Sequence, residues 1–236
     1  MDAAVGWYGK LPSLGDFAQR RLPRAFVEDW DDWLQQCLQA SRAALDSDWM
    51  AHYLGAPVWR FVLLPGVIGT DAWAGVLLPS VDRVGRYFPL TVCARLPGCA
   101  PFGSSLAAIE HWLDELAACA LLGLDAGSGH LRLEAALREL VRQTVPASCQ
   151  TMPTHQAETG MPAGFLDALA ARLLPQLLAG KSVWWCVSPD KGCTGFSCQG
   201  LPAPTDFADL LCGKVPAAPA QAGPGVLNAI HRNMLA

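Results

Sequence analysis

Residues 77–90 read Leu77-Leu78-Pro79-Ser80-Val81-Asp82-Arg83-Val84-Gly85-Arg86-Tyr87-Phe88-Pro89-Leu90. The apolar runs Ala72–Val76 and Leu90–Ala94 lie on either side of this stretch. Both runs are short and bounded by Gly or Pro, which is typical of buried strands. The stretch is therefore predicted to contain a loop that joins two strands.

The composition of this loop indicates a fixed shape with a charged tip. Pro79 and Pro89 fix their own φ angles and restrict the residues before them. Gly85 can adopt a positive φ that other residues resist. The polar residues that we expect at this edge of the sheet are Ser80, Asp82, Arg83 and Arg86.

Two interpretations of these charges stay open. In the first, Asp82 pairs with an arginine and only holds the loop shut, as ordered loops commonly do. In the second, Arg83 or Arg86 faces a partner or ligand, because Arg is suited to planar, bidentate recognition of carboxylate or phosphate.

A second conspicuous stretch reads Gly6-Trp7-Tyr8-Gly9-Lys10-Leu11-Pro12-Ser13-Leu14-Gly15-Asp16-Phe17. Its aromatic start, Gly6–Gly9, predicts an early strand, and Lys10–Phe17 predicts a loop. A phosphate-binding loop requires Gly followed directly by Lys and then Ser or Thr, and Lys10 instead precedes a Leu-Pro pair. Asp16 either caps local N–H groups or forms a surface with Lys10.

These two stretches together resemble the TagF family of type VI secretion-associated proteins, and Ser182–Trp185 and Gly200–Pro202 also fit the family. The resemblance implies a three-layer α/β/α arrangement around a mixed, partly antiparallel sheet. We expect one TagF-like domain over residues 1–212 and a flexible, Ala/Pro/Gly-rich tail over residues 213–236.

The resemblance also implies a function. TagF-like proteins are non-catalytic accessory regulators of type VI secretion in Gram-negative bacteria, and they act after translation to hold the secretion machine inactive. They are linked to an FHA-domain scaffold protein and to the threonine phosphorylation pathway. The expected partners are therefore that scaffold and, as a second candidate, the pathway's threonine phosphatase.

The candidate binding residues come from both loops, which we expect to lie close together. They are Lys10, Ser13 and Asp16 in the first loop, and Ser80, Asp82, Arg83 and Arg86 in the second. The resemblance supplies no catalytic residue. A structural clasp without a binding role is the alternative for the same residues.

The usual signatures of enzymes and metal sites are absent from the sequence. None of the five histidines lies in either loop, although a catalytic site needs a nucleophile, a base and an orienting group. Cys186, Cys193 and Cys198 lack the spacing of a structural zinc site. No cofactor and no metal are therefore predicted.

Two other functional classes remain as alternatives. The first is a hydrolase or phosphate-ester-binding enzyme that uses Asp82, Arg83 and Arg86. A pocket that joins these residues with Asp16 would favour this enzyme, whereas a closed network of salt bridges without a cavity would count against it. The second is a pure scaffold that binds through an exposed apolar face of the Leu22–Leu38 helix.

Composition limits the kinds of partner. The 236-residue chain is 52% apolar and 16% charged, which supports a sizeable core. Its net charge is −4 without a Lys/Arg cluster, so nucleic acid and anionic membranes are poor candidates. No apolar run reaches the ~18 residues of a membrane span. The acidic start at Met1-Asp2 does not resemble a signal peptide, so we expect a cytoplasmic protein with reduced cysteines.

Helical periodicity is strongest from Leu22 to Leu45, where Phe26, Trp30 and Trp33 fall on one face and charged residues on the other. The tryptophans are predicted to lie in the core. Further helices are predicted on both sides of the break at residues 127–129, over Phe165–Ala179, and as short segments near Trp49–Leu54 and Pro204–Leu211. Their expected caps are Asp46 or Ser47 and Thr205 or Asp206.

The remaining strands are predicted at Pro57–Pro65, Ser182–Ser188 and Thr194–Gln199. The first of these forms an antiparallel meander with the two strands around the second loop, because the connections are short. Arg60 interrupts its apolar run and needs a carboxylate, for which Asp82 and Asp71 are the candidates. The polar segment Thr144–Pro162 is predicted to be a mobile excursion.

Overall fold

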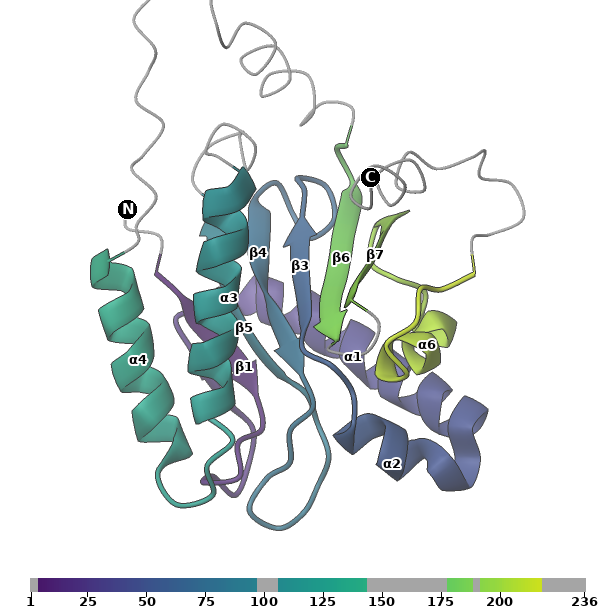
Figure 1. Ribbon diagram of the computed structural model, residues 1–236, viewed down its shortest axis with the longest axis horizontal. Coiled ribbons are helices and arrows are strands. Elements are labelled where there is room, and N and C mark those ends of the chain that lie inside the picture. Colours follow the sequence, from purple (N-terminus) through teal and green to yellow (C-terminus); the bar gives the residue numbers. More distant parts are fainter. Residues whose placement is uncertain (1–3, 97–105, 144–177, 189–191, 218–236) are drawn as a thin grey trace, which may run out of the picture.

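The computed structural model describes residues 4–96, 106–143, 178–188 and 192–217. Its strands form one sheet with the order β2-β1-β5-β4-β3-β6-β7 (Figure 1). The strands are β1 (Gly6–Gly9), β2 (Ala18–Arg20), β3 (Trp59–Leu63), β4 (Ala72–Leu78), β5 (Leu90–Leu96), β6 (Lys181–Ser188) and β7 (Gly192–Gln199). The helices are α1 (Arg24–Leu45), α2 (Trp49–Leu54), α3 (Leu106–Leu122), α4 (Gly129–Gln143) and α6 (Phe207–Leu211).

All strand pairs among the described residues are antiparallel. The prediction of an α/β fold is confirmed, and the prediction of a mixed sheet is wrong. The meander β3-β4-β5 forms as predicted, because its short connections can join only antiparallel neighbours. The pairs β1–β5 and β3–β6, which come from distant parts of the chain, are antiparallel as well.

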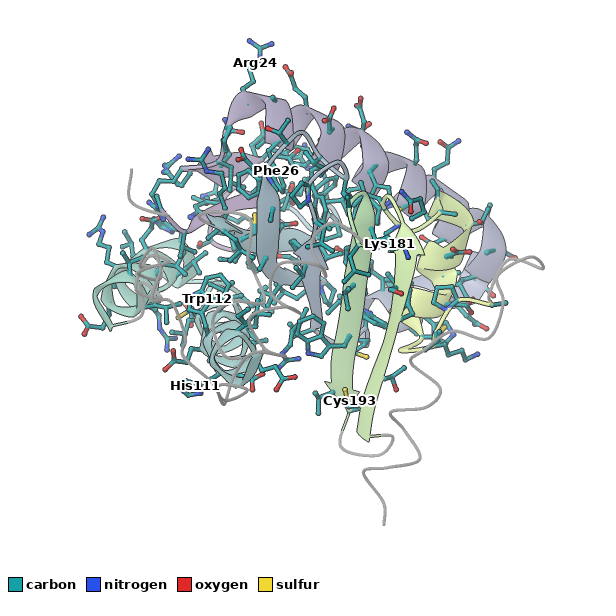
Figure 2. All side chains as sticks on the ribbon, turned by 90° about the horizontal axis from the view of Figure 1, so that it is seen from above. Arg24, Phe26, His111, Trp112, Lys181 and Cys193 are labelled. Atoms are coloured by element: carbon teal, nitrogen blue, oxygen red, sulfur yellow. The ribbon has the colours of Figure 1, made fainter. Side chains whose placement is uncertain are left out.

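Side chains alternate between the two faces of the sheet, and helices lie on both faces. In β3, Phe61 packs into a core with α1, whereas Val62 packs into a core with α3 and α4. Figure 2 shows Phe26 of α1 on one side of the sheet and Trp112 of α3 on the opposite side. Near-continuous apolar strands are therefore required, since both of their faces are buried.

Helix α1 confirms the prediction of an amphipathic helix that ends at Leu45. Trp30 is fully buried, and its ring centroid lies 5.0 Å from that of Phe61. Its indole N–H donates to Thr91 Oγ1 at 2.8 Å, which satisfies the one polar group that the ring carries into the core. The tryptophans of α1 thus serve packing, as predicted.

The predicted partner of Arg60 is wrong. Its guanidinium Nε donates to Asp114 Oδ1 of α3 at 2.8 Å, rather than to Asp71 or Asp82. Arg60 has the same parity in β3 as Val62, so it points to the face that α3 covers. Asp71 instead pairs with Arg95 on the neighbouring strand.

The predicted helix caps are also wrong. Neither Asp46 nor Ser47 caps α2 through its side chain. Asp206 holds the N-cap position of α6, but neither Asp206 nor Thr205 makes a side-chain cap hydrogen bond. Each short helix instead follows a 3₁₀ turn, η1 (Asp46–Asp48) or η2 (Pro204–Asp206), whose first carbonyl accepts an N–H from the start of the helix. Strand β2 was not predicted, since its residues are largely exposed and too few to show alternation.

Three predicted segments lie outside the described residues, wholly or in large part. They are the excursion over residues 144–162, the helix over residues 165–179 and the tail over residues 213–236. Within the described ranges, no helix combines the length and the apolar character that a membrane span requires.

Candidate functional site

The first loop (residues 10–17) follows β1, and the second loop (residues 79–89) joins β4 to β5. Strands β1 and β5 are neighbours with Tyr8 opposite Thr91, and β4 pairs with β5 with Leu78 opposite Leu90. Both loops therefore leave the sheet at the same end (Figure 1). The prediction that they lie close together is confirmed, and we call them the paired loops.

Gly9 marks the point where β1 ends and the first loop begins. Its φ is +136°, a region that L side chains rarely adopt. A Cβ at this position would lie 2.1 Å from the carbonyl oxygen of Pro89 in the second loop. The paired loops approach this closely only because residue 9 has no side chain.

Asp82 is the centre of the paired loops. Its side chain is 0% exposed, and four donors surround the carboxylate. The Arg86 guanidinium Nε and the Lys10 Nζ lie 2.6 Å and 3.0 Å from Oδ2. The backbone N–H groups of Val84 and Arg86 donate to Oδ1 at 3.0 Å and 2.9 Å. The interpretation in which Asp82 holds the loop shut is thus supported by its contacts.

Burial and hydrogen bonding act in opposite directions on Asp82. Burial alone would raise the pKa of its carboxyl group, but the N–H of Arg86 and the side chains of Lys10 and Arg86 stabilise the ionised form. The net effect holds the pKa well below its ordinary value of 3.8. Asp82 is therefore a fixed negative charge within the protein.

Lys10 and Ser80, two of the candidate binding residues, are internal to the paired loops. Lys10 is 4% exposed, and its Nζ lies 4.8 Å from the centre of the Phe17 ring. Ser80 is also 4% exposed, and its Oγ donates to the Lys10 carbonyl at 2.7 Å. Tyr53 of α2 donates its hydroxyl to the Ser80 carbonyl and accepts the Ser80 N–H. These contacts fix the second loop to both the first loop and α2.

Ser13 binds a residue that sequence reasoning did not single out. The Ser13 Oγ accepts the backbone N–H of His130 at 3.1 Å, and the His130 ring Nδ1 lies 3.1 Å from the same oxygen. Residue 130 is in the first turn of α4, where N–H groups lack partners within the helix. Ser13 therefore attaches the first loop to the start of α4, and no local signal in the sequence announces this contact.

Arg83, Arg86 and Asp16 form the exposed part of the paired loops. Arg86 reaches Gly15 with an Nη2–O distance of 2.6 Å, and Asp16 lies 3.8 Å from the same nitrogen with its side chain 81% exposed. The Arg83 backbone N–H donates to the Leu14 carbonyl at 2.8 Å. Within the described part of the chain, the Arg83 guanidinium has no hydrogen bond or ion pair.

Comparisons with known proteins identify the domain that carries these loops. The family model of the TagF N-terminal domain, type VI secretion system-associated, matches residues 6–140, which is more than half of the chain. The chain belongs to the TagF family. The crystal structure of PA0076 from Pseudomonas aeruginosa PAO1 is similar, with a TM-score of 0.70 and 34% sequence identity over 94% of this chain and 100% of that chain. A comparison with curated proteins gave no match.

The TagF match includes both paired loops and the helices that support them. Sequence reasoning correctly placed all seven candidate residues in these loops, but it did not separate the buried ones from the exposed ones. Lys10, Ser80 and Asp82 are internal, Ser13 is half-buried against α4, and Asp16, Arg83 and Arg86 are exposed. A binding role for these residues stays a prediction.

Two cavities of this TagF domain do not include the charged residues of the paired loops. One cavity of about 270 Å³ lies beside Pro57, and a much smaller apolar one of about 20 Å³ lies beside Pro79. Neither is lined by Asp16, Asp82, Arg83 or Arg86. The described ranges also contain no group of three or more His, Cys, Asp or Glu side chains that could hold a metal ion.

The lowered pKa of Asp82 predicts a specific acid sensitivity for this TagF domain. The unfolded chain binds a proton at Asp82 at a higher pH than the folded protein does, so protonation favours unfolding. The stability from Asp82 is present above about pH 5 and is lost as the pH falls below about 4. Urea denaturation from about pH 5 down to about pH 3 should show a steeper loss of stability for the wild type than for Asp82→Asn. Parallel losses in the two proteins would contradict this assignment.

Proposed function

We propose that this protein regulates type VI secretion by binding a partner protein through the exposed tip of the paired loops. We further propose that the partner is the FHA-domain scaffold of the secretion system and that binding holds the machine inactive. Membership of the TagF family supports the link to secretion. The proposed surface rests on one observation: the guanidinium of Arg83 is exposed and takes no part in the network around Asp82.

The contacts around Arg83 fix the backbone from which its side chain extends. Its backbone is fixed by the hydrogen bond to Leu14, and the turn that follows is closed by the Gly85 N–H to the Asp82 carbonyl at 3.0 Å. Asp82 has its own cations in Lys10 and Arg86. Because the backbone that carries Arg83 is already fixed, little backbone freedom is lost on binding, which favours affinity.

Exposed apolar side chains lie in the same loops as the charged tip and in helix α2. Phe17 is 45% exposed and Val84 is 66% exposed in the paired loops, and Met50 of α2 is 53% exposed. The Tyr87 hydroxyl lies 3.0 Å from the Met50 sulfur, so α2 adjoins the second loop. Arg together with aromatic and Met side chains is the composition that protein interfaces favour, and this supports a protein partner.

The contacts of Asp82 disfavour the hydrolase or phosphate-ester enzyme. Its carboxylate is buried and already accepts four hydrogen bonds, so it is not available as a nucleophile or a base. A closed network of salt bridges was expected to count against an enzyme, and Asp16, Asp82 and Arg86 line neither of the two cavities. Scaffold binding through α1 is disfavoured as well, because Phe26, Trp30 and the other large apolar residues between Arg24 and Leu38 are buried.

A secretion assay tests the proposed regulation. In a Gram-negative bacterium with an active type VI system, production of the wild-type protein should lower secretion of a type VI substrate. Arg83→Ala should relieve this inhibition because it removes the exposed cation without touching the Asp82 network. Arg24→Ala is a matched control, since Arg24 is an exposed arginine of α1 whose side chain is 89% exposed.

The outcomes of this assay separate the parts of the proposal. Full inhibition by Arg83→Ala, at equal protein levels, would contradict the role of Arg83. The test bacterium must also produce the cognate scaffold. Secretion that stays unchanged when such a bacterium produces the wild-type protein would contradict the regulatory function itself.

A further inference from the structure

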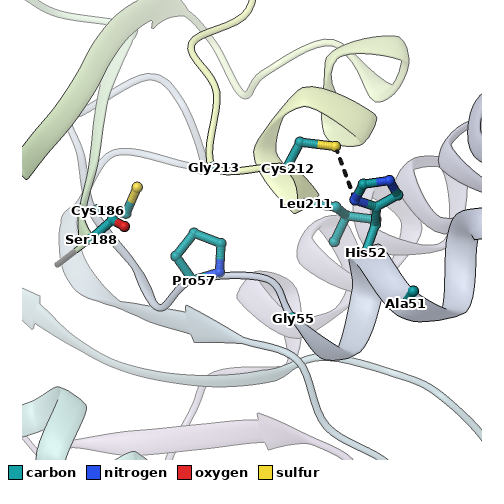
Figure 3. A pocket seen from close by; sticks show the side chains of 9 residues that line it. All are labelled: Ala51, His52, Gly55, Pro57, Cys186, Ser188, Leu211, Cys212 and Gly213. Atoms are coloured by element: carbon teal, nitrogen blue, oxygen red, sulfur yellow. Dashed lines mark hydrogen bonds between the residues drawn. The ribbon is translucent and has the colours of Figure 1, made fainter. Parts of the chain in front are cut away.

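A Cys–His pair lines the cavity beside Pro57, away from the paired loops. The cavity has a volume of about 270 Å³ and lies between the C-terminal ends of α2 and α6 (Figure 3). The Cys212 Sγ lies 3.5 Å from the His52 Nδ1, and both residues are half-buried. The two residues are far apart in the sequence, so only the fold brings them together.

The contact has the form of an activated nucleophile. An imidazole nitrogen within hydrogen-bond reach of a thiol can accept its proton, and the thiolate is the reactive form of cysteine. His52 is in the last turn of α2, and Cys212 directly follows the last residue of α6. Backbone hydrogen bonds at the two helix ends hold the backbone of both residues in place.

The other described cysteines lack this combination of access and a neighbouring imidazole. Cys37 and Cys93 are fully buried, and burial raises the pKa of both thiols. Cys186 lines the same cavity but is only 1% exposed. Cys193 is exposed near the end of the β6–β7 hairpin (Figure 2), where no histidine contacts it among the described residues.

The walls of the cavity suggest which reagents can enter. Gly55 and Gly213 contribute backbone without side chains, so peptide groups line part of the space next to Cys212. The N–H groups of both glycines already donate within the chain, to the carbonyls of Ala51 and Leu210. The glycines therefore leave open space beside Cys212 that a small molecule can enter.

We propose that Cys212 and His52 form a reactive thiol site that is modified by the disulfide of a small peptide thiol, of which oxidised glutathione is the probe. His52 Nδ1 accepts the proton of the Cys212 thiol, and the thiolate attacks one sulfur of the disulfide. A new S–S bond forms at Cys212 as the bond in the reagent breaks. The leaving thiolate takes the proton from His52, so that Cys212 is oxidised and one equivalent of the small thiol is released in reduced form.

The test is treatment of the reduced full chain with oxidised glutathione, followed by digestion and mass spectrometry to measure the rate at each cysteine. We expect Cys212 to react at least about tenfold faster than the more exposed Cys193. This ratio lies within the roughly 30-fold gain in reaction rate that complete ionisation gives an ordinary thiol at neutral pH. His52→Ala should reduce the rate at Cys212 to about that of Cys193, and added imidazole should restore part of it.

Two controls keep the test decisive. Cys212→Ser should lose the fast modification without changing the rate at Cys193. His52→Gln keeps a polar side chain of similar size but is not a base, so it should be as slow as His52→Ala and retain the wild-type fold. Equal rates at Cys212 and Cys193 in the wild type would overturn the proposal, as would a wild-type rate in both His52 variants.

Discussion

Gly9→Ala is expected to lower the free energy of unfolding by about 4 kcal/mol or more, a loss that few single substitutions cause. The new Cβ would lie 2.1 Å from the Pro89 carbonyl oxygen, and real Cβ atoms do not approach that closely. The obstacle is backbone, so it cannot move aside as a flexible side chain can. Either β1 must separate from β5 or the second loop must shift, and both changes break the contacts around Asp82.

Gly85→Ala separates the steric collision from simple backbone strain. Gly85 also has a positive φ, +84°, but a Cβ there would meet nothing within 4 Å. Its replacement should cost about 1–2 kcal/mol, the penalty of the left-handed region alone. Urea denaturation measures both variants. Similar losses in the two would show that the approach of the paired loops at Gly9 has no special importance.

Lys10→Met should be the next most damaging substitution, at about 2–3 kcal/mol. Methionine retains most of the volume of lysine but removes the charge that lies 3.0 Å from the buried carboxylate of Asp82. Asp82 would keep Arg86 and two backbone donors, which is why the expected loss stays below that of a fully isolated buried charge.

Arg95→Met is the matched control for Lys10→Met. Arg95 pairs with Asp71 at 3.3 Å, but both side chains are nearly half exposed. Exposed ion pairs contribute little, so this variant should change stability by less than about 1 kcal/mol. The interpretation of Asp82 as a buried centre would be wrong if Lys10→Met and Arg95→Met gave the same midpoint in urea.

Local patterns were sufficient to predict the backbone of this protein in large part. The periodicity of Leu22–Leu45 predicted α1, and short apolar runs framed by Gly and Pro predicted the meander. The hypothesis that both conspicuous loops meet was confirmed as well. Each of these inferences depends on spacing within a short window, which is the information that a single sequence carries best.

The contacts that define the site were not predictable in the same way. The sequence suggested an arginine for Asp82, and Arg86 does bind it, but the buried Lys10 comes from the other loop. The contact of Ser13 with His130 and that of Arg60 with Asp114 likewise join distant elements. Such partners depend on how strands and helices pack, and no local rule contains that information.

The burial of side chains within the paired loops was also not predictable from the sequence. Polar composition did not distinguish the buried candidate residues from the exposed ones, because a polar residue with enough hydrogen-bond partners is readily buried. Ser80 illustrates this, since Lys10, Tyr53 and Phe88 together satisfy its polar groups. The structure therefore narrows the proposed binding surface to Arg83 and its exposed neighbours.

Binding of the purified protein to its cognate FHA-domain scaffold tests the central claim most directly, with wild type, Arg83→Ala and Arg24→Ala compared by titration. Arg83 is a better probe than Arg86, whose loss would also disturb Asp82. We expect Arg83→Ala to weaken binding by about 1.5–3 kcal/mol, the range for a hydrogen bond to a charged group, while Arg24→Ala binds like the wild type. Equal affinity in all three proteins would show that the interface does not include Arg83. Absence of wild-type binding at micromolar concentrations would contradict direct recognition of the scaffold.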